Sequence, residues 1–192
     1  LTSSVLAQLT SGPCSRRTSI VLSEIHYHPP SEAPVNREFI ELYNSSPISV
    51  DLSGWKLRGD ADFVFPDGTR LEGKQFLIVA ADPSLFADEN VTALGPWSGT
   101  LSNGGGRARL RKASGGIVLD TNYQDNNRWP AAADGAGHSL ILKYPSYGES
   151  RREAWAASYN YGGSPGAFDP VATDSLDQII ISEILANNGE GQ

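Results

Sequence analysis

Methionine is absent from the 192-residue chain, and cysteine occurs once, at Cys14. A single cysteine cannot form an internal disulfide, and the sequence shows neither a thiol framework nor a cysteine-based zinc site. No run of about 18 apolar residues is present, which excludes a predicted membrane-spanning helix. Because translation begins with methionine and this chain begins at Leu1, we expect a processed chain or a piece of a longer one.

Charge is also scarce. Charged residues make up 19% of the chain, against about 25% in an average soluble domain, and the formal net charge is −7. Hydrophobic residues reach 39%, which is too many for a disordered acidic tail. Glycine (20 residues) and proline (12 residues) recur throughout, so no heptad repeat is sustained and a coiled coil is excluded.

Short apolar segments separated by turn residues recur along the chain. They lie at 20–22, 39–43, 53–57, 63–65, 76–80, 108–111, 117–119 and 140–142. Segments of this length at this spacing predict an all-β sandwich or barrel.

Two local patterns predict more detail. In the second apolar segment, alternation predicts that Ile40 and Leu42 lie on one face of a strand. Phe39 and Glu41 then lie on the opposite face. One helical turn is predicted over 82–86, because its first residue is a capping aspartate and its second is proline.

The segment 20–25 (IVLSEI) reappears as 179–184 (IIISEI), with four of six residues identical and two aliphatic exchanges. Such a repeat predicts that a second structural unit begins near the end of the chain. We therefore expect four parts: 1–18, a linker or the tail of a preceding unit; 19–169, a complete domain; 170–178, a linker; and 179–192, the first strand of a following repeat.

Several motifs follow one another in a specific order and spacing. They are 20–29 (IVLSEIHYHP), 38–44 (EFIELYN), 50–55 (VDLSGW), 63–69 (FVFPDGT), 71–80 (LEGKQFLIVA), 101–104 (LSNG), Trp155 and 162–166 (GGSPG). Together they resemble the bacterial lamin-tail domain, and the resemblance covers about 150 residues. It implies an immunoglobulin-like β-sandwich with no catalytic role of its own. We therefore expect a module of a larger multidomain protein that serves as a scaffold, a spacer or a protein-interaction domain.

The resemblance also implies a context. Such modules are strung along large secreted or surface proteins of bacteria, so we expect an extracellular, cell-surface or periplasmic location. The expected partners are neighbouring domains of the same polypeptide, other proteins or extracellular polymers. Two glycosylation sequons, at Asn44 and Asn90, are compatible with an exposed extracellular surface.

The sequence contains no recognisable catalytic machinery. The motif 162–166 satisfies G-x-S-x-G, but the residue after the serine is Pro165, which has no N–H to donate to an oxyanion. Glu24 and Glu41 could form a carboxylate pair, although nothing in the sequence sets their separation. We therefore expect a non-enzymatic protein.

Metal and cofactor sites are also not expected. His26 and His28 have the spacing of two ligands on one strand, but a third ligand is missing. The segment that starts at Asp120 is not an EF-hand, because its sixth residue, Asp125, should be glycine. A looser surface calcium site near Asp120 or Asp125 stays open beside the alternative of a solvated loop.

The main binding candidate is a basic strand. Arg107, Arg109 and Arg111 should project from one face of a strand, with Lys112 next to them. This face could bind an anionic polymer, carbohydrate or DNA, or it could be an ordinary solvated sheet face. The net charge of −7 argues against DNA as the ligand, because it repels a polyanion at long range.

Two loop tryptophans are weaker candidates. Trp97 and Trp129 each lie next to a proline and could stack on a carbohydrate, although core anchoring is the favoured alternative. The glycine-rich segment 103–106 lacks the Lys-Ser/Thr ending of a phosphate-binding loop. A hairpin turn between Leu101 and Leu110 is predicted there instead.

Overall fold

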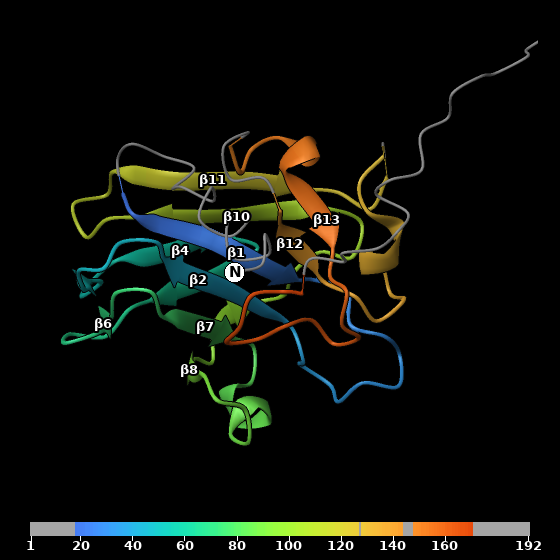
Figure 1. Cartoon of the computed structure of the whole chain (residues 1–192), viewed down its shortest axis with the longest axis horizontal. Coiled ribbons are helices and arrows are strands. Elements are labelled where there is room, and N and C mark those ends of the chain that lie inside the picture. The colour runs from blue at the N-terminus through green and yellow to red at the C-terminus, as the bar shows by residue number, and fades with distance from the viewer. Residues whose placement is uncertain (1–17, 127, 144–147, 171–192) are drawn as a thin grey trace, which may run out of the picture.

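The computed structural model describes residues 18–126, 128–143 and 148–170 (Figure 1). The part of the chain that it describes contains two main sheets and no α-helix. The six-stranded sheet has the order β13 (Trp155–Ala157), β12 (Leu140–Leu142), β1 (Ile20–His26), β2 (Phe39–Asn44), β7 (Phe76–Ala80) and β8 (Thr92–Leu94). The five-stranded sheet has the order β11 (Ile117–Tyr123), β10 (Gly106–Arg111), β4 (Lys56–Gly59), β5 (Ala61–Val64) and β9 (Ser98–Gly99).

Smaller elements complete the fold. A two-stranded sheet pairs β3 (Val50–Asp51) with β6 (Arg70–Leu71). The 3₁₀ turns among the described residues are η1 (Pro83–Phe86), η2 (Ala131–Ala133) and η4 (Arg152–Ala154). The described strands pair antiparallel except β7 and β8, which are parallel. Within the described ranges, no helix is long and apolar enough to cross a membrane.

The two main sheets enclose one large hydrophobic core. Leu42 from the six-stranded sheet and Leu57 and Leu110 from the five-stranded sheet all belong to it, and each is almost fully buried. Alternating side chains from two facing sheets produce a core of this kind. The prediction of an all-β, immunoglobulin-like sandwich is therefore confirmed.

Two local predictions are also confirmed. Ile40 belongs to the large core, whereas Phe39, on the other face of β2, belongs to a second, smaller cluster. The turn at η1 is capped by Asp82, whose carboxylate accepts a hydrogen bond from the backbone N–H of Ser84 at 3.0 Å. An aspartate in this position satisfies a backbone donor that the first turn leaves free.

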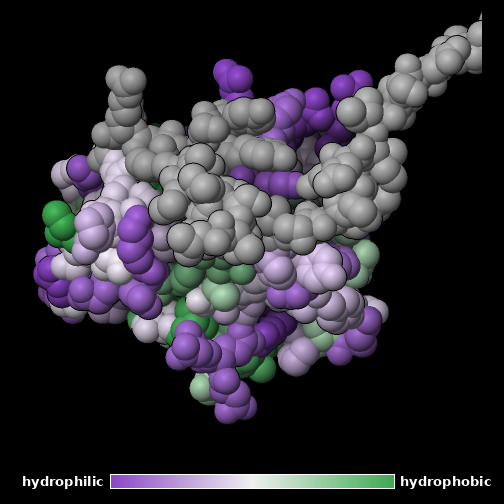
Figure 2. Space-filling model, in the orientation of Figure 1, coloured by the Kyte–Doolittle hydropathy of each residue, from purple (hydrophilic) through white to green (hydrophobic). Residues whose placement is uncertain are grey.

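The outer face of the six-stranded sheet is covered by two segments. Phe86 of η1 packs edge-on against Phe39, with ring centroids 5.4 Å apart. Residues 158–169, called the closing segment below, cross the outer face of β1 and β2 (Figure 1, orange and red). Figure 2 shows hydrophobic areas surrounded by hydrophilic surface on this side of the molecule. Both faces of β2 are therefore buried.

One sequence prediction is wrong, and one of the two sequons is buried. No hairpin joins Leu101 to Leu110, because β10 pairs with β4 and β11 while β9 pairs with β5. A tight turn remains there, with the Gly105 N–H donating to the Ser102 carbonyl at 3.3 Å. The sequon at Asn44 is not on the surface: this side chain is fully buried and donates to two backbone carbonyls.

Three predicted parts lie outside the described residues. These are the linker predicted over 1–18, apart from its last residue, the linker over 170–178, apart from its first residue, and the first strand of a following repeat over 179–192. The proposed boundaries between them and the domain remain predictions.

Candidate functional site

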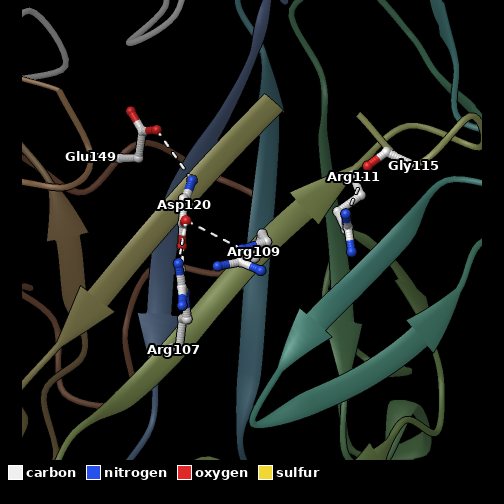
Figure 3. A network of polar contacts seen from close by, with 6 residues as sticks. All are labelled: Arg107, Arg109, Arg111, Gly115, Asp120 and Glu149. Atoms are coloured by element: carbon white, nitrogen blue, oxygen red, sulfur yellow. Dashed lines mark hydrogen bonds and ion pairs between the residues drawn. The ribbon is translucent and has the colours of Figure 1, made fainter. Parts of the chain in front are cut away.

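The basic strand lies where the sequence places it. Ala108 and Leu110 of β10 are buried in the large core. Arg107, Arg109 and Arg111 alternate with them and lie on the outer face of the five-stranded sheet (Figure 3). The strand therefore combines a core-forming side and a solvent-facing cationic side.

The neighbouring strand β4 extends this cationic surface. Leu57 is buried opposite Leu110, so the residues on either side of Leu57 face outward. Lys56 is the register partner of Arg111, and Arg58 is the register partner of Arg109. We call these four residues the cationic quartet. The two β4 members were not predicted from the sequence, although the alternation Lys-Leu-Arg at 56–58 has the same form as Arg-Leu-Arg at 109–111.

The quartet consists of two like-charged cross-strand pairs. Directly opposite residues in antiparallel strands have Cβ atoms about 4.5–5.5 Å apart, and like charges at that spacing destabilise a sheet. Successive members on one strand are two residues apart, or about 7 Å. The four cationic side chains therefore occupy one small area of the sheet, at a cost to stability that an opposing anion would offset.

Asp120 of β11 neutralises one side of this surface. Its carboxylate accepts from Arg107 Nε at 2.8 Å, from Arg107 Nη2 at 2.6 Å and from Arg109 Nε at 3.2 Å (Figure 3). The hydrogen bonds from Arg107 and the charge of Arg109 lower the pKa of Asp120. A calcium ion at Asp120 would have to displace two guanidinium groups, so this arrangement disfavours the calcium site that the sequence left open there.

The other side of the surface keeps its positive charge. Arg111 Nε donates to the Gly115 carbonyl at 2.9 Å, and Arg58 Nε lies 3.7 Å from Asp62 Oδ1. Among the described residues, no carboxylate forms an ion pair with Lys56, Arg111 or Lys112. This end of the quartet is therefore the part most available to an external anion.

The tryptophan candidates have a different environment. Only 7% of Trp97 and 8% of Trp129 is exposed, and both belong to the large core. The Trp129 ring also lies 6.5 Å from that of Trp155. Rings that are this deeply buried offer no platform for a sugar, and their position fits the core-anchoring alternative.

The residues weighed for metal binding do not come together. His28 Nδ1 lies 2.6 Å from Asp134 Oδ1, whereas His26 is buried beside Phe39 with neither ring nitrogen hydrogen-bonded. Burial lowers the pKa of His26 to about 4, so it is neutral at pH 7. Oδ1 of Asp125 is buried without a partner, but within the described ranges no three His, Cys, Asp or Glu side chains form a metal-binding group.

The serine of the G-x-S-x-G match lacks the partners of a nucleophile. Ser164 Oγ donates to Asp169 Oδ2 at 2.8 Å, and its backbone N–H donates to Glu24. No histidine is hydrogen-bonded to this hydroxyl, and the residue is 6% exposed. A catalytic serine needs an adjacent base, so the geometry gives no support for hydrolase chemistry here.

One comparison with known proteins agrees with the fold. A family model described as the Lamin Tail Domain matches residues 14–125. A search of curated proteins gave no match. Among solved structures, a DUF4876 family protein from Bacteroides thetaiotaomicron matches with 12% identity and a TM-score of 0.45. The match covers 82% of this chain and 74% of that chain. A likeness at this level says nothing about function.

Proposed function

The chain belongs to the lamin tail domain family, and from this premise we propose that it is a non-catalytic interaction module whose cationic quartet binds an anionic polysaccharide. The family is in general non-enzymatic. We further propose that the module is part of a larger bacterial protein located outside the cytoplasm. There it would connect neighbouring domains to a surrounding polymer.

One observation supports binding above all. Lys56 opposes Arg111 and Arg58 opposes Arg109 on one sheet face, in a protein whose formal net charge is −7. Like charges in register destabilise a sheet. Asp62 and Asp120 offset this for Arg58 and Arg109, but among the described residues the pair of Lys56 and Arg111 has no acidic partner. An anion that bridges the two strands would turn this repulsion into attraction.

The charge distribution favours a polysaccharide over DNA. Duplex DNA carries one negative charge per roughly 1.7 Å of helix axis, and the overall charge of the module repels such a dense polyanion. The flat sheet face also offers no helix or ribbon to enter a groove.

The test is equilibrium binding to three probes: heparin, polyglutamate and duplex DNA, each at low and at physiological salt. The double variant Lys56→Glu/Arg111→Glu removes the end of the quartet that has no carboxylate partner. If each of the two side chains contributes about 1–1.5 kcal/mol of charge-assisted contact, heparin binding weakens roughly 30- to 150-fold.

The matched control for this variant is Arg70→Glu/Lys74→Glu. It changes the net charge by the same amount, but both residues lie away from the quartet, on or next to β6. We expect the control to retain most of the affinity. Equal loss in both variants would show only a general charge effect, and tighter binding of DNA than of heparin would overturn the choice of ligand.

A second expected result concerns Asp120, which competes with an external anion for Arg107 and Arg109. Asp120→Asn removes this internal counter-ion, so we expect heparin to bind about 3- to 10-fold more tightly, a gain of roughly 1 kcal/mol. The control Asp67→Asn makes the same charge change on an exposed turn residue. Unchanged or weaker binding by Asp120→Asn, measured by titration calorimetry, would show that Asp120 does not compete.

The repeat at 179–184 favours a second candidate function, that of a spacer in a tandem array. A spacer needs a stable fold and chain connections but no ligand face. The two candidates differ in the binding assay: if no probe binds at low salt, the quartet has no binding role and the spacer is favoured.

A further inference from the structure

Two glutamates lie opposite each other on the covered face of the six-stranded sheet. Glu24 of β1 and Glu41 of β2 are register partners, with exposures of 2% and 1%. A register shift between Leu22 and Glu24 places the Glu24 side chain on the outer face while Ile25 stays in the core. A bulge of this kind turns a side chain toward the opposite face of its strand.

Both glutamates bind the closing segment. Glu24 accepts a hydrogen bond from the backbone N–H of Ser164 at 3.1 Å, and Glu41 accepts from the backbone N–H of Gly166 at 2.7 Å. Each also accepts from a serine hydroxyl: Ser139 donates to Glu24, and Ser23 donates to Glu41 at 2.6 Å. The two carboxyl groups therefore connect three neighbouring parts of the chain to one point of the sheet.

The closing segment is also bonded to itself and packed on aromatic rings. Asp169 accepts hydrogen bonds from the Tyr159 N–H at 2.9 Å and from Ser164 Oγ at 2.8 Å, which closes the segment into a loop. The Phe168 ring lies 4.8 Å from Tyr43 and 5.0 Å from Phe76. Release of the segment would therefore expose an aromatic area on the outer face of β2 and β7.

The pair is poorly suited to carry two negative charges. Burial raises the pKa of Glu24 to about 7, with further increases from the charges of Asp169 and Glu89. Burial, and then the charge of Glu24, raises the pKa of Glu41 well above its ordinary value. His26, which is also buried on β1, is neutral in this pH range and supplies no compensating charge. Two carboxyl groups in such surroundings do not both ionise at the pH at which free carboxyl groups do.

We propose that Glu24 and Glu41 form a proton-dependent latch, which holds the closing segment on the sheet while the pair keeps a proton and releases it when both carboxyl groups are ionised. Ionisation leaves two like charges directly opposite each other in a dry site. Lifting the segment admits water to both carboxylates, which lowers their repulsion. Opening of the latch therefore controls the exposure of the aromatic area around Tyr43 and Phe76.

The test is hydrogen exchange, followed by mass spectrometry between pH 6 and pH 9 and corrected for the intrinsic pH dependence of exchange. The measured quantity is the ratio of the exchange rate in residues 158–169 to the exchange rate in β10. In the wild type we expect this ratio to increase at least about tenfold from pH 6 to pH 9. The variant Glu41→Gln keeps an oxygen that can accept from Gly166 but cannot ionise. In this variant the ratio should stay constant over the same range.

Two results would overturn the latch. One is a constant ratio in the wild type, and the other is an equal increase in Glu41→Gln. If Glu41→Gln does not fold, as judged by circular dichroism, Glu24→Gln takes its place with the same expected result. The wild-type series is decisive without either variant, because a latch that depends on protons must open as they leave.

Discussion

Between pH 4.5 and pH 8, the Glu24→Gln variant is expected to gain about 3 kcal/mol of stability relative to the wild type. An unfolded chain ionises this side chain near its ordinary pKa of 4.5, whereas burial raises the pKa in the folded state to about 7. Across this interval the folded wild type binds more protons than the unfolded chain, so its stability falls as the pH rises. Glutamine has no proton to lose, and the variant avoids this cost.

The stability of the wild type must be compared with that of a variant, because His26 changes stability with pH in the opposite direction to Glu24. Burial lowers its folded pKa to about 4 from an ordinary value of 6.5, so stability rises with pH between these values. In the wild type alone, the contributions of His26 and Glu24 largely cancel below pH 6.5. Because both proteins contain His26, its contribution drops out of their difference.

Urea denaturation at half-unit pH steps measures this difference. We expect the two stability curves to converge near pH 4.5 and to separate progressively up to about pH 7, with the variant higher. Parallel curves over the whole range would show that Glu24 ionises as readily in the folded protein as in the unfolded chain. If the wild type became more stable relative to the variant as the pH rises, the expected direction of the effect would be wrong.

Gly163→Ala is expected to be the most damaging single exchange in the closing segment, with a loss of at least about 3 kcal/mol. A Cβ atom at this position would lie 2.1 Å from Glu24 Oε1 and 3.2 Å from the Phe39 ring. The backbone φ of +87° is also a conformation that residues with a Cβ rarely adopt. Relief of the contact requires movement of a buried carboxyl group that holds two other parts of the chain.

The adjacent glycine provides a matched control. Gly162 has a φ of +83°, but a Cβ atom there would meet nothing within 4 Å. Gly162→Ala therefore carries only the backbone strain, about 1 kcal/mol. The difference between the two variants in chemical denaturation isolates the contact with Glu24. Equal losses would mean that the fit between Gly163 and Glu24 is unimportant.

The sequence predicted the features that depend on local patterns. Alternation placed Ile40 in the core, and the Asp82-Pro83 pair identified the capped turn. The outward projection of Arg107 and Arg109 followed from the same period-two rule. Each of these depends only on residues close together in the chain.

The features that the sequence did not predict depend on long-range register. Lys56 and Arg58 join the basic surface only because β4 pairs with β10, some 50 positions later in the chain. Glu24 and Glu41 could be named from the sequence as a possible carboxylate pair, but their alignment could not, because it depends on the bulge in β1, which no turn residue or glycine marks. The false hairpin after Leu101 has the same origin, since a flexible turn does not determine which strands pair.

Arginine side-chain NMR tests the binding claim most directly. The Nε–H signals of the ¹⁵N-labelled wild type would be recorded during titration with a heparin oligosaccharide at physiological salt. Binding at the quartet predicts that the signals of Arg58, Arg109 and Arg111 shift together, while those of Arg37 and Arg70 do not. Shifts confined to arginines outside the quartet, or no shift at saturating oligosaccharide, would contradict it.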